Sequence, residues 1–339
     1  MQQSNGWRRM VAWALVGVLM IVLWATPGWT RKPKEEKPKP TEGEIAGLLV
    51  ALEDEWPEVK GLVFGRLAEF DGQALRGTLK QPEVLAKKAF DILKDEKVAA
   101  NARGSAAEAL GHLGEASTPY VKDILDILKD EKVAANVRGS AAEALGHLGE
   151  ASKPYVKDIL DIFKDEKVAA YVRGSAAEAL GNLGEASKPY VKDILAFLKD
   201  EKVDANVRRS AAEALGHLGE ASKLYVKDIL AFLKDEKVAA DVRGRAAEAL
   251  GNLGEASKPY VKNILAFLKD EKVTGYVRGR AAEALGHLGE ASKPYVKNIL
   301  AFLKDEKVTG YVRGRAAEAL GHLGEASKPY VKNILAFLK

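Results

Sequence analysis

The strongest constraint on the fold of this chain is an internal repeat of 35 residues. Seven units, each opening with an aspartate, run without a gap to Lys339 and begin at Asp95, Asp130, Asp165, Asp200, Asp235, Asp270 and Asp305. The units that begin at Asp270 and Asp305 are identical at every position. A fixed period of this length is typical of repeat proteins, in which each unit packs on its neighbours and stability comes from stacking.

Each unit is predicted to form two helices, as the unit that begins at Asp130 illustrates. Apolar residues at helical spacing predict a first helix over residues 135–148, with the stripe Val137, Ala141, Ala144, Leu145 and Leu148. Gly149 suits the left-handed residue that ends this helix, while Ser152 and Pro154 suit the N-cap and first turn of a second helix that runs to about Lys164. The second stripe is Val156, Ile159, Leu160 and Phe163, widened by Tyr155 and Ile162.

A stripe this broad must pack both on the first helix of its own unit and on the next unit. Arg138, which recurs in every unit, lies at the edge of the first stripe. We therefore expect the recurring arginines and the opening aspartates to form an ion-pair ladder between successive units.

The segment VRGSAAEALGHLG, followed by a proline-led amphipathic helix, resembles the HEAT-like repeat in the short form seen in phycobilisome lyases. The resemblance covers residues 95–339 and implies an all-α fold, a right-handed α-solenoid of stacked helix pairs. It also implies that the first helices form the convex face and that the second helices line the concave, binding face.

Two groups of enzymes share such repeats, and the sequence argues against both. Bilin lyases work inside the cell, which the leader described below contradicts. Deoxyhypusine hydroxylases use adjacent His-Glu pairs as iron ligands, but no histidine of this chain is followed by glutamate. We therefore expect a protein that is not an enzyme, with an enzyme or enzyme subunit of these two types as the alternative.

The first 94 residues follow different rules. Arg8 and Arg9 precede the uncharged apolar run 10–26, so residues 1–30 are predicted to be a cleaved signal peptide or an uncleaved signal anchor, an apolar helix that would hold the chain in a membrane. Both alternatives place the remainder on the periplasmic or extracellular side. Residues 31–42 are a charged, proline-rich flexible linker. Residues 43–94 are predicted to be a helical cap with a degenerate repeat.

The repeat positions offer no arrangement typical of catalysis, metal binding or cofactor binding. The chain has no cysteine, and its histidines, His112, His147, His217, His287 and His322, occupy one repeat column on successive helices. Helices packed 8–10 Å apart do not bring such a column to one zinc ion, so the column is predicted to be a polar surface position. Glu143 and Glu150 are predicted to be solvated, and Gly139, Gly146 and Gly149 to serve packing and capping.

Surface charge is the feature that varies along the repeats. Counting Lys and Arg against Asp and Glu, successive units carry −2, −1, 0, 0, +1, +2 and +2. The drift arises where aspartates of the second helix become asparagine or alanine, and where Ser105, Ser140, Ser175 and Ser210 become Arg245, Arg280 and Arg315. Neutral drift after duplication and a graded binding surface both account for this pattern. The overall charge of only +4 gives no reason to expect nucleic acid.

The predicted function is a non-catalytic scaffold for protein–protein contacts, exported or tethered to the membrane through residues 10–26. Its partner is an unidentified protein. The alternative is a structural array that self-associates through the uncapped last repeat. The candidate binding residues face solvent on the second helices: Lys122, Asp123, Asp126, Lys157, Asp158, Asp161, Lys192, Asp193, Lys227, Asp228, Lys262, Asn263, Lys297, Asn298, Lys332 and Asn333.

Overall fold

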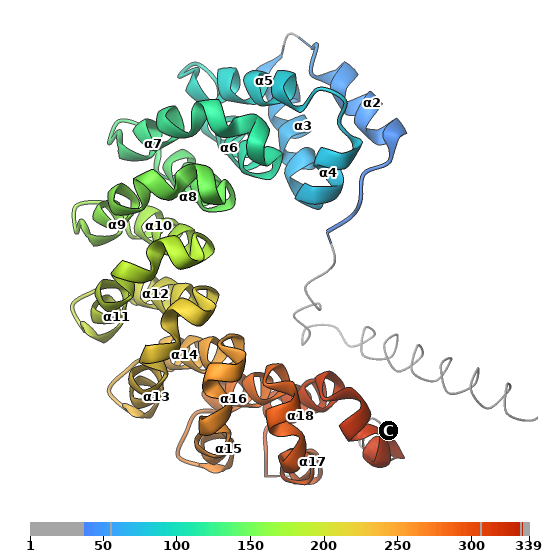
Figure 1. Ribbon diagram of the computed structural model, residues 1–339, viewed down its shortest axis with the longest axis vertical. Coiled ribbons are helices and arrows are strands. Elements are labelled where there is room, and N and C mark those ends of the chain that lie inside the picture. Colours follow the sequence, from blue (N-terminus) through green and yellow to red (C-terminus); the bar gives the residue numbers. More distant parts are fainter. Residues whose placement is uncertain (1–36, 55, 306, 333, 335–339) are drawn as a thin grey trace, which may run out of the picture. The chain divides into compact units, whose positions relative to one another are not determined.

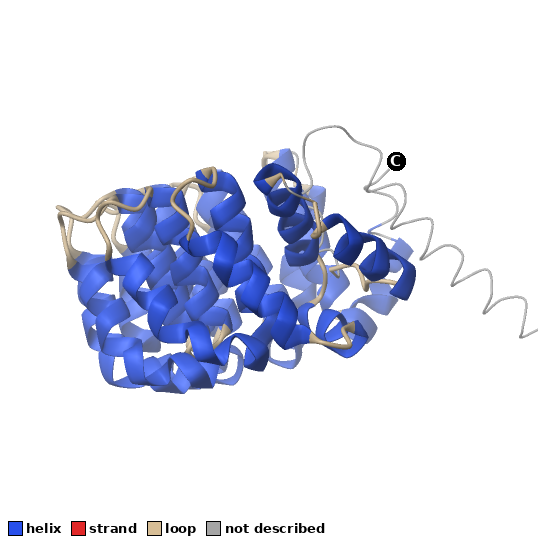
Figure 2. Cartoon of the chain, turned by 90° about the horizontal axis from the view of Figure 1, so that it is seen from above, coloured by secondary structure: helices blue, strands red, loops and turns tan. Residues whose placement is uncertain are grey.

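A computed structural model describes residues 37–54, 56–305, 307–332 and 334. The predicted leader and most of the predicted linker lie outside these residues. Throughout the described part the regular structure is helical, and the helices are joined by short loops (Figure 2). No helix of this part is both long and apolar enough to cross a bilayer.

Within the described residues, four helices precede the repeats: α2 (Glu42–Ala51), α3 (Pro57–Glu69), α4 (Gly72–Thr78) and α5 (Pro82–Lys94). Thr41 and Glu44 form a reciprocal capping box at the start of α2. Prolines open α3 and α5, where the missing N–H has no intrahelical partner to lose. Helix α3 packs on the first helix of the first repeat, so this segment continues the stack rather than forming a separate body.

Each repeat contains a first helix, a 3-10 segment and a second helix. The first helices are α6 (Ala100–Leu113), α8 (Ala135–His147), α10 (Ala170–Asn182), α12 (Ala205–His217), α14 (Ala240–Asn252), α16 (Gly275–His287) and α18 (Gly310–His322). The second helices are α7 (Val121–Lys129), α9 (Val156–Lys164), α11 (Val191–Lys199), α13 (Val226–Lys234), α15 (Val261–Lys269) and α17 (Val296–Lys304). The 3-10 segments are η1 (Gly114–Tyr120), η2 (Gly149–Tyr155), η3 (Gly184–Tyr190), η4 (Gly219–Tyr225), η5 (Gly254–Tyr260), η6 (Gly289–Tyr295) and η7 (Gly324–Tyr330).

The predicted apolar stripes form the core. Val137, Ala141 and Leu145 of α8 and Ile159 and Phe163 of α9 are fully buried. Gly149 has φ of +52°, the left-handed conformation predicted at the end of α8. An all-α stack of helix pairs is thereby confirmed.

The predicted capping role of Ser152 is wrong. Residues Gly149–Tyr155 form the 3-10 segment η2, and α9 begins only at Val156, after Tyr155 at its N-cap. The Ser152 side chain lies buried inside η2, and Pro154 also belongs to that segment. The 3-10 turn therefore takes the place of the first turn that the sequence predicts for the second helix.

The predicted Asp–Arg ladder is also wrong. Nε of Arg138 donates to the main-chain oxygen of Leu128, at 2.8 Å, near the end of the preceding second helix. The carboxylate of Asp130 instead accepts from the N–H of Lys132 in the loop, at 2.9 Å. The last carbonyls of a helix lack intrahelical donors, and a buried guanidinium satisfies one of them here.

The two sets of helices form two layers with different packing. From α6 to α18, successive first helices pack on one another, whereas each second helix packs mainly on the first helix of the following repeat. The first helices approach closely because their contact residues are small: a Cβ added to Gly146 of α8 would lie 2.8 Å from Cα of Ala179 in α10. Among the described helices, successive second helices do not pack closely on one another.

Unequal spacing of the two layers bends the stack formed by the repeats. In Figure 1 the closely packed first helices follow the inner side of the arc, and the second helices follow the outer side. The prediction that the first helices are convex and the second helices concave is therefore wrong. Small residues reduce the distance between successive first helices. The layer of first helices is therefore the shorter, inner one, and the second helices lie on the convex side.

Candidate functional site

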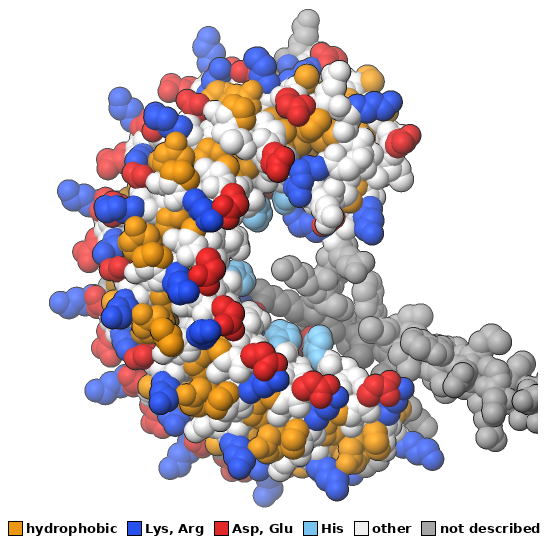
Figure 3. All heavy atoms as spheres, in the orientation of Figure 1, with side chains coloured by type: hydrophobic (Ala, Val, Ile, Leu, Met, Phe, Trp, Pro, Cys, Tyr) orange, Lys and Arg blue, Asp and Glu red, His pale blue; other side chains and the backbone are white. Residues whose placement is uncertain are grey.

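The candidate binding residues form a band along the convex side of the repeats. Those that the structure describes are exposed or half-exposed, and Asn333 lies outside the described residues. They extend from Lys122 of α7 to Lys332 after η7, so the band follows the second helices from repeat to repeat. Figure 3 shows charged side chains projecting from this outer side.

Ion pairs engage most of the band in the first half of the repeats. Within helices, Lys122 pairs with Asp126 at 3.0 Å and Lys157 with Asp161 at 2.9 Å. Between helices, the last lysines of α7, α9 and α11 pair with an aspartate of the next second helix: Lys129 with Asp158, Lys164 with Asp193 (2.9 Å) and Lys199 with Asp228 (3.0 Å). These pairs are well exposed, so each contributes at most about 1 kcal/mol.

The second half of the band has lost these acidic partners. Helices α15 and α17 share the sequence VKNILAFLK, which carries two lysines and no carboxylate. Asn263 and Asn298 stand where the aspartates of the ladder would be, and Ala266 and Ala301 stand where α7 and α9 have their second aspartate. The convex side therefore changes from mutually paired charge to lysines without an acidic partner on their own helix.

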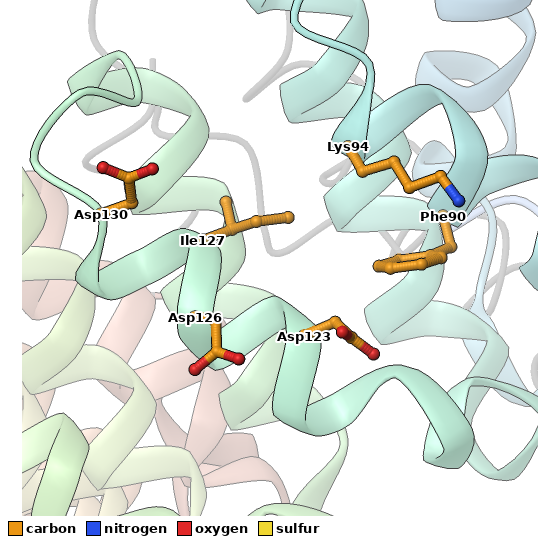
Figure 4. A pocket seen from close by; sticks show the side chains of 6 residues that line it. All are labelled: Phe90, Lys94, Asp123, Asp126, Ile127 and Asp130. Carbon is orange, nitrogen blue, oxygen red and sulfur yellow. The ribbon is translucent and has the colours of Figure 1, made fainter.

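A shallow groove of about 290 Å³ interrupts the convex side between α5 and α7 (Figure 4). It is lined by Phe90 and Lys94 of α5 and by Asp123, Asp126, Ile127 and Asp130 of α7 and its C-cap. The ammonium group of Lys94 lies 5.1 Å from the centre of the Phe90 ring and pairs with Asp91 of its own helix at 3.1 Å, so it does not engage Asp123. Its aromatic wall and carboxylates suit a cationic side chain, and it includes two of the predicted binding residues.

The concave side carries a second strip, which the sequence did not predict. On each first helix, four positions at helical spacing share this face: in α8 they are Asn136, Ser140, Glu143 and His147. Figure 3 shows the histidines on this inner side. Because the repeats stack, the equivalent residues of successive first helices form a column at each of these four positions.

Arginine neutralises the glutamate column in the last three repeats. Arg245 bridges Glu213 at 2.8 Å and Glu248 at 2.9 Å, and Arg280 bridges Glu248 and Glu283 in the same way. Both arginines are buried, with under a tenth of their surface exposed. The serine-to-arginine change thus adds little positive charge to the surface, although the sequence suggested that it would.

In the first repeats the glutamate column has only serine opposite it. Ser175 Oγ donates to Glu143 at 3.1 Å, and Ser140 Oγ donates to Glu108 at 3.3 Å. Burial raises the pKa of Glu143, and the carboxylates of Glu178 and Glu108 raise it further. The prediction that Glu143 is a solvated, isolated charge is therefore wrong, because stacking brings the glutamates together.

Replacing Glu143 by glutamine is expected to stabilise the protein by roughly 0.5 kcal/mol at pH 7, since it removes like charges from a half-buried site. The folded-state pKa lies above the ordinary value of 4.5, so ionisation costs stability. That cost is absent below pH 4.5, appears as the pH rises through the folded-state pKa and is complete above it. Urea unfolding of both proteins at pH 4 and pH 7 measures the difference, and a gain that was the same at both pH values would contradict this assignment.

Four of the five histidines lie in two pairs, and His217 stands by itself between Asn182 and Asn252. The rings of His112 and His147 lie 5.1 Å apart, as do those of His287 and His322 at 5.4 Å. Within the described ranges, no group of three or more potential metal ligands occurs. Asn182 and Asn252 interrupt the column between these pairs.

A second relation missed at the sequence level couples glycine to tyrosine. Added Cβ atoms at Gly139, Gly244 and Gly279 would collide with the rings of Tyr171, Tyr276 and Tyr311 of the following repeats. Arg209 replaces this glycine in one repeat, and the following repeat there has Asp241 in place of tyrosine. The sequence signal for this contact was the occurrence of a glycine and a tyrosine 32 residues apart.

Comparison with known proteins agrees with the architecture. The family model described as HEAT repeats matches residues 86–181, 166–251 and 194–286, which together span more than half of the chain. No curated protein matches the sequence.

Similar solved structures include the karyopherin Kap121p bound to the extreme C-terminus of the protein phosphatase Cdc14p, with 18% identity and a TM-score of 0.52. Kap121p bound to the SUMO protease Ulp1p gives the same two values. Each comparison covers 87% of this chain but only 35% of the karyopherin, so the chain spans about a third of its length. At this identity the likeness concerns the fold alone, and the family match shows that the chain belongs to the HEAT-repeat proteins.

Proposed function

We propose that this protein is a non-catalytic scaffold that binds protein partners through the convex band of its second helices. The observation that supports the proposal is the band itself: the same solvent-facing positions recur on every second helix, and only their charge changes along the chain. Kap121p, which has a similar fold, is described in complexes with other proteins. A rigid stack that repeats one surface suits an extended partner better than a small substrate.

The test is affinity capture with the full chain and two sets of charge reversals. Reversal of Lys157, Asp158 and Asp161 alters the convex band, and reversal of Glu143 and Glu178 alters the concave strip. Both sets lie on exposed or half-exposed positions, so thermal unfolding should report folded protein in each case. Loss of partner capture only in the convex set supports the proposal. Loss only in the concave set would move the binding surface to the first helices.

We further propose that the scaffold works outside the cytoplasm, on the periplasmic or extracellular side. The support is the order of residues 8–30, two arginines followed by an uncharged apolar run. N-terminal sequencing of the protein recovered from cells separates a cleaved signal peptide from an uncleaved anchor through residues 10–26. Recovery of the intact chain in the cytosolic fraction would contradict both.

Self-association is the second candidate function. Gly286 of α16 lies against α18, whereas the equivalent Gly321 of α18 has no atom of the described residues within 4 Å of an added Cβ. We propose that this side of α18, which no described residue covers at Gly321, takes part in the self-association. Light scattering coupled to gel filtration tests the proposal, and a mass of one chain at all concentrations would rule it out.

A further inference from the structure

The convex side of the last repeats carries a grid of lysines that the charge ladder no longer engages. Its members are Lys234, Lys262, Lys269, Lys297 and Lys304, on α13, α15 and α17, and all are exposed. Within the part of the chain that the structure describes, no carboxylate lies within ion-pairing distance of any of them. We call these five residues the lysine grid.

Three of the carboxylates near the grid form ion pairs with other lysines. Asp228, the last aspartate of the ladder, pairs backwards with Lys199 at 3.0 Å. Glu255 and Glu290 pair with Lys258 and Lys293 of their own 3-10 segments. Asp270, in the loop after α15, accepts from the N–H of Lys272 at 2.9 Å. The Asp270 carboxylate keeps its charge, but among the described residues it forms no direct ion pair with a lysine of the grid.

The spacing of the grid suits an elongated anion. Lys262 and Lys269 are seven residues apart on one helix, which corresponds to about 10 Å along its axis. Lys297 and Lys304 repeat this spacing on the next second helix. Between the lysines of each helix stands Asn263 or Asn298, whose amide can both donate to and accept from a bound main chain.

The side chains around the grid distinguish between classes of anion. In this half, Arg245, Arg280 and Arg315 pair with glutamates on the concave side. Arg243 and Arg278 are buried and donate to main-chain oxygens of the preceding second helices. None of these five guanidinium groups belongs to the grid, and planar guanidinium groups are the ones that favour phosphate. The aromatic residues Phe267 and Phe302 of α15 and α17 are buried and cannot stack on bases. Buried apolar side chains also leave these two helices with nothing to insert into a bilayer.

We propose that the lysine grid docks an acidic segment of a protein partner, rich in aspartate or glutamate. This inference rests on the proposed scaffold function and names the chemistry of its partner. Opposite charges would attract the acidic segment and orient it on the grid. The contact would form at α15 and α17, where asparagine and alanine replace the aspartates.

The chain offers its own control for the experiment. The variant Asn263→Asp, Ala266→Asp, Asn298→Asp, Ala301→Asp gives α15 and α17 the aspartates that α7 and α9 carry. The converse variant, Asp123→Asn, Asp126→Ala, Asp158→Asn, Asp161→Ala, removes the aspartates from α7 and α9. Each helix then carries residues that its equivalents already tolerate, so both variants are expected to fold.

The probe is a fluorescent ten-residue glutamate peptide, compared with the glutamine peptide of the same length, by anisotropy in about 20 mM salt. We expect the full chain to bind the glutamate peptide, and binding to weaken at least tenfold in the first variant and to strengthen several-fold in the converse variant. Equal binding in all three proteins, or no binding at all, would overturn the inference. So would a preference for phosphatidylserine vesicles or a DNA duplex over the peptide.

Peptide binding and partner capture together distinguish failure of the lysine-grid proposal from failure of the scaffold proposal. Peptide binding without any captured protein would support the grid and count against the scaffold. Capture of a partner that the first variant retains in full would support the scaffold and remove the grid from its interface.

Discussion

Replacing Gly286 by alanine is expected to destabilise the stack by roughly 1–3 kcal/mol, the usual cost of inserting a methyl group where no space exists. The added Cβ would lie 2.8 Å from Cα of Ala319, a main-chain atom that cannot rotate away. The two first helices must then separate at this junction. Urea unfolding should show a lower midpoint for the variant.

The same substitution at Gly321 provides the matched control, because Gly286 and Gly321 occupy identical 35-residue units. An added Cβ at Gly321 meets no described atom within 4 Å. Alanine is favoured over glycine inside a helix by about 1 kcal/mol, so Gly321→Ala should stabilise the last repeat slightly. Equal effects of the two substitutions would show that close approach of the first helices does not govern the stack.

Replacing Arg173 by methionine is expected to cost about 1.5–3 kcal/mol, the range for a charge-assisted hydrogen bond lost from a buried acceptor. Nε of Arg173 donates to the main-chain oxygen of Phe163 at 2.9 Å, and the guanidinium lies 5.7 Å from the ring centre of Phe197. Methionine fills similar volume but leaves the carbonyl at the end of α9 without a donor. The unfolding midpoint in urea measures the loss.

Lys167→Met in the loop of the same repeat serves as its control. That side chain is exposed and should change the stability by less than about 0.5 kcal/mol. If Arg173→Met behaved like the loop substitution, the arginine column would not be a structural link between the helices of adjoining repeats.

The helix pairs could be predicted from the sequence because the apolar spacing and the glycine stop are local signals. Val137, Leu145 and Gly149 behave as their spacing indicates. Ser152 and Pro154 misled the prediction, since their preference for helix starts also suits the 3-10 segment in which they lie. The end of a helix at a glycine is a local property of the chain. The choice between an α-helix and a 3-10 helix for the next segment depends on packing.

The curvature of the stack depends on a comparison of layers rather than on one helix. Gly139 and Gly146 of the first helices were correctly assigned to packing, but the sequence does not show in which direction this packing bends the stack. Gly146 against Ala179 shows that the layer of small residues is the shorter one. The convex and concave assignments of the two helices are reversed for this reason.

The convex band could be predicted from the sequence, whereas the concave strip could not. The convex band follows from solvent-facing positions on single helices, so Lys122, Asp158 and their equivalents could be identified. The concave glutamate column could not, since Glu143 acquires its carboxylate neighbours only when repeats stack. The change in charge along the repeats also has different consequences on the two sides. On the concave side Arg280 is buried against glutamates, and on the convex side Lys269 remains exposed.

Distances between spin labels test most directly which helices face outward. The chain has no cysteine, so pairs of introduced cysteines can be labelled without background. One pair replaces His147 and His287 on the concave side, and the other replaces Lys157 and Lys297 on the convex side, each four repeats apart. We predict a shorter distance for the histidine pair than for the lysine pair, because the concave side is the shorter side of the arc. A shorter distance for the lysine pair would contradict it and would return the second helices to the concave side.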